Sequence, residues 1–177
     1  MIFELIQICK TIYDKGYVVA AGGNISYRIS SDRILIKRSG KSFGALTPED
    51  FIIINLNDSS PEASIDLPIH QAIYLNSEFK AVIHAHPPHT IVLSNKINEL
   101  EPIDFETKLK VGAIPVVNIP HEKLYLIIGD YVRQGYKAII ERNHGVYIWG
   151  RKLTECLSLL EMIERAAQVF LLNKMLK

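Results

Sequence analysis

The sequence predicts a single α/β domain spanning residues 1–177, because short strand-like apolar runs alternate with amphipathic helical segments along the chain. A length of 177 residues is enough for one compact domain and too short for two of ordinary size. Hydrophobic residues make up 48% of the chain and charged residues 22%, which is the balance of a globular protein with a substantial core. The sequence shows no internal repeat, low-complexity tract or linker that would divide it.

Apolar spacing and turn residues define the elements of the first half. Residues 2–15 carry apolar side chains on one helical face. A glycine-rich bend at 21–26 runs into a possible strand, and the stretch 33–37 indicates a second one. Residues 47–50 (TPED) are a helix-start signature, with an N-cap, a proline and two acids in the first turn. The apolar run at 51–54 that follows predicts a buried strand.

The second half alternates in the same way. Residues 66–77 have helical spacing, and residues 80–86 (KAVIHAH) form a strand pattern that Pro87 and Pro88 stop. The remaining predicted elements are, in order, a strand at 114–119, a helix at 122–134, paired strands at 137–142 and 146–149, and a helix at 153–175.

Charge and leader features exclude several classes of partner. Twenty basic and nineteen acidic residues leave a net charge of +1, so no overall field attracts nucleic acid or an anionic membrane. The first ten residues lack the features of a signal peptide, and no apolar run reaches the ~20 residues that span a bilayer. Cys9 and Cys156 lie in helical patterns and are predicted to be buried thiols of a cytoplasmic protein. We therefore expect neither nucleic acid nor membrane as a partner.

The histidines indicate a metal site. His84 and His86 are two residues apart in a predicted strand, so both side chains point to the same face. A third ligand must come from elsewhere, and His144 is the best candidate because it lies in a tight turn at the end of a strand. Three imidazoles favour zinc or a neighbouring transition metal and leave a coordination position open. The other histidines, which we expect to be helix or loop residues, are His70, His89 and His121.

A metal that polarises a carbonyl needs a base nearby to move the adjacent proton. Asp66, at the start of a predicted helix, is the first candidate, although an acid there also stabilises the helix dipole. Glu106 is a second candidate.

Small residues in turns can bind an anion through their N–H groups and hydroxyls. The candidates for a phosphate site are Gly23, Asn24, Ser39, Gly40 and Ser64, with added charge from the flanking Arg38 and Lys41. Each of these segments also fits an ordinary turn.

Five segments in this order and spacing resemble the class II aldolase/adducin family, and specifically its fuculose-1-phosphate aldolase-like branch: GGNIS, RSG, SIDLPIHQAIY, AVIHAH and RNHGVYIWG. The resemblance covers nearly the whole chain. It implies a three-layer α/β/α fold around a central, mainly antiparallel sheet. It also implies a homotetramer with active sites at the subunit interfaces.

The resemblance further assigns roles to the residues named above. His84, His86 and His144 match the ligands of Zn²⁺, or of another divalent transition metal such as Mn²⁺ or Co²⁺. Asp66 matches the acid/base, and the five turn residues match the phosphate pocket. The implied reaction is reversible cleavage of a ketose 1-phosphate, a small phosphorylated sugar, to dihydroxyacetone phosphate and an aldehyde through a metal-stabilised enediolate.

Three departures from the family pattern bear on the substrate. Asp66 stands where the aldolases usually carry glutamate. The related ribulose-5-phosphate 4-epimerases also carry aspartate at this position. Ile65 replaces a second phosphate-binding serine, and Arg38 stands where threonine or proline is common. The sequence ends at Lys177, straight after the last predicted helix, so we expect no tail tyrosine to protonate the aldehyde oxygen.

Two alternatives follow from the same resemblance. A pentulose-phosphate 4-epimerase is favoured by Asp66 and disfavoured by Lys108, which stands where an epimerase should carry an acid. A non-catalytic module like the adducin head is disfavoured by the three histidines and the adjacent carboxylate. Other lyases on this scaffold, dehydratases or decarboxylases, also fit.

Overall fold

In the computed structural model, residues 1–176 are described, and they form eight strands in one sheet with the order β3-β2-β1-β4-β8-β7-β6-β5. The strands are β1 (Asn24–Arg28), β2 (Arg33–Lys37), β3 (Phe51–Asn55), β4 (Ala81–Ala85), β5 (Glu99–Leu100), β6 (Ile114–Val117), β7 (Ala138–Glu141) and β8 (Gly145–Gly150). Neighbouring strands run antiparallel except β6 and β7, which are parallel. The predicted class, α/β with a mainly antiparallel sheet, is therefore confirmed.

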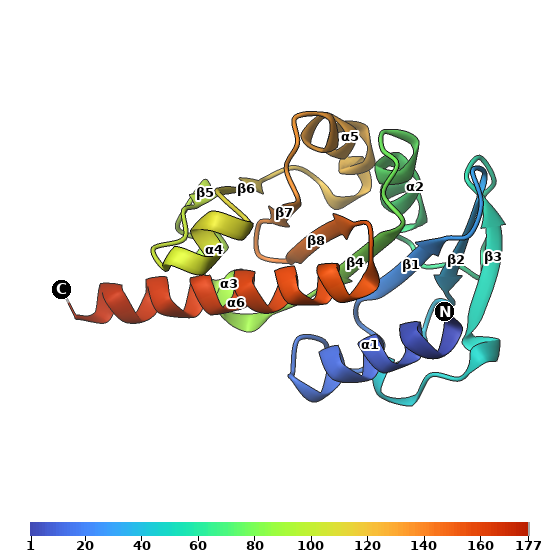
Figure 1. The fold of residues 1–177 in the computed structure, drawn as a ribbon, viewed down its shortest axis with the longest axis horizontal. Helices are drawn as coiled ribbons and strands as arrows, with labels where there is room; N and C mark the ends of the chain where they lie inside the picture. The colour runs from blue at the N-terminus through green and yellow to red at the C-terminus, as the bar shows by residue number, and fades with distance from the viewer. Residues whose placement is uncertain (177) are drawn as a thin grey trace.

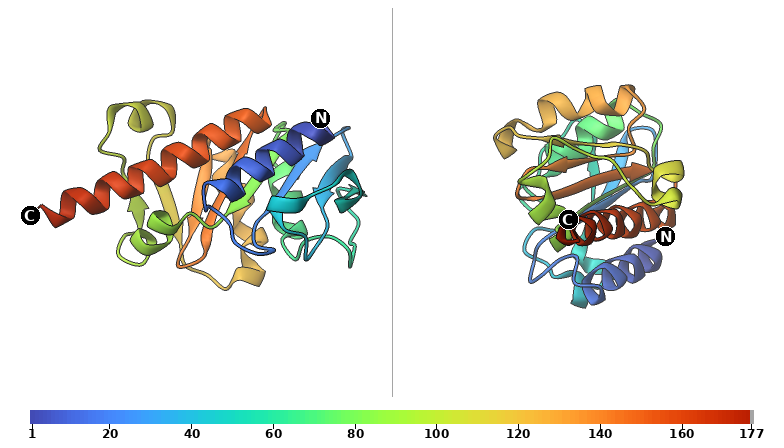
Figure 2. Two further views of the ribbon diagram at one scale, coloured as in Figure 1. Left: turned by 90° about the horizontal axis from the view of Figure 1, so that it is seen from below. Right: turned by 90° about the vertical axis from the view of Figure 1, so that its left-hand side faces the viewer.

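Helices cover both faces of this sheet (Figures 1 and 2). The helical segments are α1 (Ile2–Asp14), η1 (Phe43–Ala45), η2 (Pro48–Asp50), α2 (Leu67–Leu75), α3 (Pro88–Ser94), α4 (Phe105–Lys110), η3 (His121–Lys123), α5 (Tyr125–Arg133) and α6 (Leu153–Met175). One face packs against α1 and α6, and the other against α2 and α5. Each face buries its own apolar core, which gives the three-layer arrangement that the family resemblance implies.

Side chains of β4 alternate between these two cores. Ile83 packs with Leu5 of α1 and Ile163 of α6. Val82 packs on the opposite face with Ile73 of α2. His84 follows the same alternation and therefore projects toward the α2–α5 face, at the end of the strand.

Most predicted elements are present, with differences at short segments. The helix-start signature at 47–50 yields only the single turn η2 before β3. β3 is the edge strand of the sheet and Ile53 is 58% exposed, so the expectation of a fully buried strand is wrong. α3, α4 and β5 were not predicted, because segments of two to seven residues carry little periodic signal.

Cys9 and Cys156 are both buried, as the helical patterns predict. Within residues 1–176, no helix is both long enough and apolar enough to cross a membrane.

Buried Glu164 of α6 fixes the start of α3. Its Oε1 accepts hydrogen bonds from the His89 backbone N–H at 3.0 Å and from the His89 Nδ1 at 2.7 Å. Its Oε2 accepts from the backbone N–H and hydroxyl of Thr90 at 2.9 and 2.8 Å. A distant carboxylate thus satisfies donors that the first turn of a helix leaves without partners.

We expect Glu164→Ala to lower the free energy of unfolding by about 2–4 kcal/mol, because buried donors to a charged group would lose their acceptor. Urea titration of the purified variant measures this loss. Glu161→Ala is the matched control, because this partly exposed acid of the same helix makes only a surface ion pair with Lys15 and its loss should change stability little. Equal losses in the two variants would contradict this role of Glu164.

Candidate metal centre

His84 and His86 reach the α2–α5 face of the sheet where β4 ends. His84 is opposite Asn24 of β1 and Tyr147 of β8 in the strand register. Its ring stacks on the ring of Tyr147, with centroids 4.0 Å apart and planes inclined by 11°. Gly145 leaves room for both imidazoles, because a Cβ at that position would lie 2.3 Å from the carbonyl oxygen of Ala85 and 2.8 Å from Cδ2 of His86.

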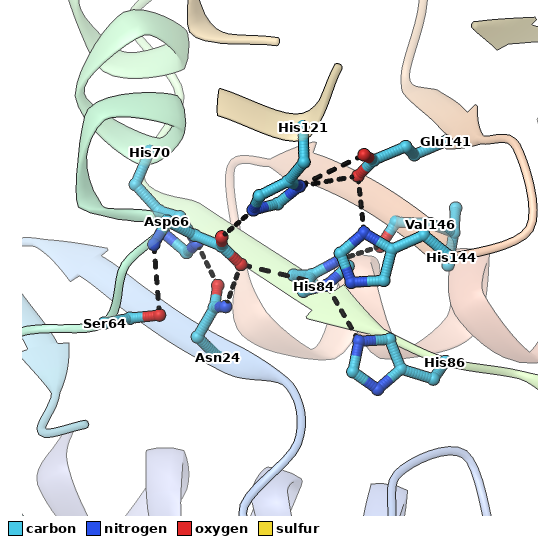
Figure 3. A network of polar contacts seen from close by, with 10 residues as sticks. All are labelled: Asn24, Ser64, Asp66, His70, His84, His86, His121, Glu141, His144 and Val146. Atoms are coloured by element: carbon cyan, nitrogen blue, oxygen red, sulfur yellow. Dashed lines mark hydrogen bonds and ion pairs between the residues drawn. The ribbon is translucent and has the colours of Figure 1, made fainter. Parts of the chain in front are cut away.

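His144 comes from the turn between β7 and β8 and joins the pair. Asn143 before it has a φ of 59°, a left-handed conformation that asparagine tolerates better than most residues. Ligand nitrogens of His84, His86 and His144 all lie within 4.8 Å of one another. The Nε2 atoms of His84 and His86 are 2.9 Å apart (Figure 3). The predicted triad is thus assembled in space.

Two of the three triad residues, His84 and His144, have their second ring nitrogen held by a hydrogen-bond partner, as metal-binding histidines do. Nδ1 of His84 donates to the carbonyl oxygen of Val146 at 3.1 Å. Nδ1 of His144 contacts Oε2 of Glu141 at 2.6 Å. Burial, reinforced by the other two histidines of the triad, lowers the pKa of His84, although Asp66 opposes this. A neutral imidazole whose Nδ1 donates keeps its Nε2 lone pair free, so these residues fit a divalent transition metal.

Asp66 lies beside the triad as the residue before α2. Its Oδ2 accepts a hydrogen bond from the side-chain amide of Asn24 and lies 3.8 Å from Nε2 of His84. Its Oδ1 lies 2.8 Å from Nε2 of His121. Burial favours a higher pKa for Asp66, but His84, the Asn24 hydrogen bond, His70 and His121 together lower that pKa. Asp66 is therefore an ionised carboxylate at neutral pH, which a general base must be.

A buried chain of hydrogen bonds supports Asn24 from α2. Nε2 of His70 is hydrogen-bonded to the side-chain oxygen of Asn24, and Nδ1 of His70 lies 2.6 Å from the Ser26 hydroxyl oxygen. The Ser26 oxygen is in turn 2.8 Å from the Tyr74 hydroxyl. Because the Asn24 oxygen only accepts, His70 donates from Nε2, and a neutral ring then accepts the proton of the Ser26 hydroxyl at Nδ1. Burial lowers the pKa of His70 to about 4, in agreement with this assignment.

The low pKa of His70 predicts a loss of stability in acid. Between its ordinary pKa of 6.5 and its folded pKa of about 4, the unfolded chain binds more protons than the folded one. The free energy of unfolding should therefore fall as the pH falls through this range, by up to about 3 kcal/mol from this group. Urea titrations of metal-free protein at several pH values measure the slope. The slope should be smaller in His70→Gln, and equal slopes would contradict the assignment.

The triad and Asp66 share one cavity of about 350 Å³ with the predicted phosphate residues. The lining includes every residue to which the family resemblance assigns a metal, acid/base or phosphate role: Gly23, Asn24, Ser39, Gly40, Ser64, Asp66, His84, His86 and His144. The Ser64 hydroxyl accepts from the Asp66 backbone N–H at 3.3 Å and keeps its own proton to donate. The Asn24 side chain contacts Asp66 and His70, which uses one of the two N–H donors of its amide.

Lys37, rather than Arg38 or Lys41, supplies the positive charge at this cavity. Its buried ammonium donates to the carbonyl oxygens of Arg38 and Lys41 at 3.2 and 2.7 Å, which holds the turn around Ser39. Arg38 instead pairs with Glu62, and Lys41 pairs with Asp50 at 2.9 Å. Neither of these two flanking cations lines the cavity, so the expectation that they add charge to the site is wrong. Arg38 follows Lys37 at the end of β2 and points to the opposite face, whereas Lys41 lies outside the strand and is held by Asp50.

His121 and Glu141 are parts of this site that sequence reasoning missed. His121 lines the cavity, and its Nδ1 lies 3.0 Å from Oε2 of Glu141. Burial disfavours its charged form, but Glu141 and Asp66 raise its pKa overall. His121 has no local signal, because its partners Glu141 and Asp66 lie 20 and 55 positions away in the sequence. Glu141 lies three residues before His144, and that spacing was a local signal that the prediction did not use. Glu106, the second predicted base, is exposed on α4 and pairs with Lys110 away from the cavity.

Nearly the whole chain matches one known protein family. The family model of the class II aldolase and adducin N-terminal domain matches residues 3–171. The chain belongs to this family. A relative from Methanococcus maripaludis, named L-fuculose phosphate aldolase, is 32% identical over 97% of either chain. A methylthioribulose-1-phosphate dehydratase from Yersinia enterocolitica is 30% identical to this chain. The match covers 97% of this chain and 91% of the dehydratase.

The fold agrees with the sequence relatives. The crystal structure of L-fuculose-1-phosphate aldolase from Thermus thermophilus matches with a TM-score of 0.91 and 27% identity, over 97% of this chain and 92% of that one. As a member of the class II aldolase family, whose enzymes depend on a divalent metal, the protein is a lyase with a histidine cluster suited to that metal.

Proposed function

We propose that the protein reversibly cleaves a ketose 1-phosphate, such as L-fuculose 1-phosphate, to dihydroxyacetone phosphate and an aldehyde. His84, His86 and His144 would hold Zn²⁺, or another divalent transition metal such as Mn²⁺ or Co²⁺. The observation that carries the proposal is the ionised Asp66 beside the triad, in the same cavity as the anion-binding turns. The aldolase relative supports the reaction type.

A divalent ion bound by the triad would supply Lewis acidity toward the ketose carbonyl. The protein's own part in proton transfer falls to Asp66. In the synthesis direction, Asp66 takes a proton from the hydroxymethyl carbon of dihydroxyacetone phosphate, and in cleavage it returns that proton. Asn24 and His121 keep the carboxylate in place while its charge changes. Lys37 is committed to two carbonyl oxygens and therefore orders the adjacent turn instead of forming a Schiff base.

The phosphate would bind at the turns on the same cavity. Gly23, Ser39, Gly40 and Ser64 line it, and the glycine N–H groups and serine hydroxyls suit phosphate oxygens. The backbone N–H of Ser39 instead donates to the carbonyl oxygen of Glu62 at 2.8 Å. The buried charge of Lys37 beneath the Ser39 turn adds attraction for the anion. A cavity of about 350 Å³ lies at the small end of the range for ligand sites, in keeping with a short sugar phosphate.

A substrate screen with zinc-reconstituted protein tests this proposal. The substrates are fuculose 1-phosphate, rhamnulose 1-phosphate, ribulose 5-phosphate and non-phosphorylated analogues. The readout is the released three-carbon ketone, which is dihydroxyacetone phosphate from the ketose 1-phosphates and dihydroxyacetone from the other substrates. We expect release from a ketose 1-phosphate and much weaker activity on the analogues. No release from any substrate by fully loaded protein would contradict the proposal.

The aspartate at position 66 favours a second candidate, a pentulose-phosphate 4-epimerase, because the related ribulose-5-phosphate 4-epimerases also carry aspartate there. In the same screen this candidate would invert C4 of ribulose 5-phosphate without net release of dihydroxyacetone and glycolaldehyde phosphate. The dehydratase relative adds a third outcome, loss of water from a ketose 1-phosphate, which mass spectrometry of the products distinguishes.

We also propose a cytoplasmic homotetramer with sites at subunit interfaces. Exposed apolar side chains on α4 and α5, among them Phe105, Leu109 and Leu126, support burial against other subunits. Light scattering should give four times the mass of the chain.

A further inference from the structure

The half-buried His121 lies between two carboxylates from different elements. It is the first residue of η3, and 30% of its side chain is exposed. Its Nε2 lies 2.8 Å from Oδ1 of Asp66, and its Nδ1 lies 3.1 and 3.0 Å from the two carboxylate oxygens of Glu141. Figure 3 shows the ring standing between the two acids. Both ring nitrogens are therefore directed at carboxylates.

Glu141 continues these contacts to the histidine triad. It ends β7, it is 5% exposed, and its Oε2 lies 2.6 Å from Nδ1 of His144. The contacts run from Asp66 through His121 and Glu141 to His144. One continuous set of hydrogen bonds thus joins the proposed base to a proposed metal ligand.

The orientation of the Asp66 carboxylate depends on His121, because a carboxylate can rotate about its Cβ–Cγ bond unless both of its oxygens are held. The amide of Asn24 holds Oδ2, which is the oxygen 3.8 Å from Nε2 of His84. His121 holds Oδ1. Asp66 is only 3% exposed, so water has little access to replace a lost donor.

We propose that His121 is a positioning residue of the active site: its ring, fixed from behind by Glu141, holds Oδ1 of Asp66 so that Oδ2 faces the metal centre. The inference rests on the proposed role of Asp66 as the base. His121 is not a fourth ligand in this arrangement, since its nitrogens face carboxylates while Nε2 of His84 and Nε2 of His86 face each other.

Three variants test this role. His121→Leu removes both donors, whereas His121→Gln keeps an amide N–H that can reach Asp66. His89→Leu is the matched control, because His89 contacts Glu164 on the opposite face of the sheet and does not line the cavity. Each zinc-reconstituted protein is assayed for bound zinc and for kcat and KM of solvent-deuterium exchange into dihydroxyacetone phosphate.

We expect His121→Leu to lower kcat of exchange by about 10- to 100-fold, the usual effect of losing a supporting hydrogen bond in a metal site. Zinc content and KM should stay unchanged, His121→Gln should recover most of the rate, and His89→Leu should match the wild type. Exchange at the wild-type rate in His121→Leu would overturn the proposal. Loss of zinc from His121→Leu would also overturn it, because His121 would then belong to the metal shell.

A second readout does not depend on activity. In protein labelled with ¹⁵N-histidine, the Nε2–H proton of His121 is identified by its loss in His121→Gln. Asp66→Asn should shift this resonance and leave the ring signals of His89 in place. An unshifted resonance would overturn the positioning role. A shifted resonance in a protein that catalyses no exchange would support the contact and reject the aldolase function instead.

Discussion

Asp66→Asn is expected to slow proton exchange at dihydroxyacetone phosphate by about 10²- to 10⁴-fold, the contribution of a well-placed general base. The amide has the shape of the carboxylate and can still contact Asn24, but it cannot accept the carbon-bound proton. Bound metal should stay at the wild-type level, because the triad supplies three imidazole nitrogens within 4.8 Å of one another. Deuterium incorporation followed by proton NMR gives the rate, and elemental analysis gives the metal.

Glu106→Gln provides the matched control for this variant. Glu106 is an exposed acid on α4 that pairs with Lys110, so its loss should leave exchange unchanged. Undiminished exchange in Asp66→Asn would remove Asp66 as the base. Glu141 would then be the next candidate, since it is the other carboxylate within reach of the triad.

His84→Ala is expected to lose both the metal and the cleavage activity. His84 is 1% exposed and lies at the centre of the triad, with rings of His86 and His144 4.7 and 4.9 Å away. Loss of a contact that only supports a ligand lowers metal affinity by about 10- to 100-fold. Removing one of the three ligands themselves should lower the affinity further. Dialysis of zinc-loaded protein followed by elemental analysis should show one ion per chain in the wild type and almost none in the variant.

His89→Ala is the control, because it removes an imidazole outside the cavity. It should retain one ion per chain. Full retention of zinc by His84→Ala would place the metal elsewhere. The cluster of His121, Glu141 and His144 would then be the first alternative to examine.

The sequence predicted the elements and residues whose signals are local. His84 and His86 share a face because residues two apart in a strand must do so. The segment around Asn143 predicted a turn, and the left-handed φ of Asn143 is the backbone feature that the turn uses. The long helix at 153–175 was predicted with its observed bounds, because six turns of apolar periodicity leave little ambiguity.

The rest depends on contacts between distant segments. α3 is short, and Glu164, 74 residues beyond Thr90, satisfies its first turn. His121 begins η3, a single turn too short to carry a periodic signal, and its partners Asp66 and Glu141 are 55 and 20 residues away. The charge at the anion turns was assigned to Arg38 and Lys41 because they flank the turn. The strand direction that places Lys37 beneath it became visible only in the folded sheet.

The most direct test of the account measures solvent-deuterium exchange into dihydroxyacetone phosphate by the wild-type protein in three states: loaded with zinc, stripped by chelator, and reloaded. The account predicts exchange in the loaded protein, none after stripping, and recovery in proportion to the zinc bound per chain. Exchange that persists in the stripped protein, or that fails in fully loaded protein, would contradict a metal-dependent reaction at His84, His86, His144 and Asp66.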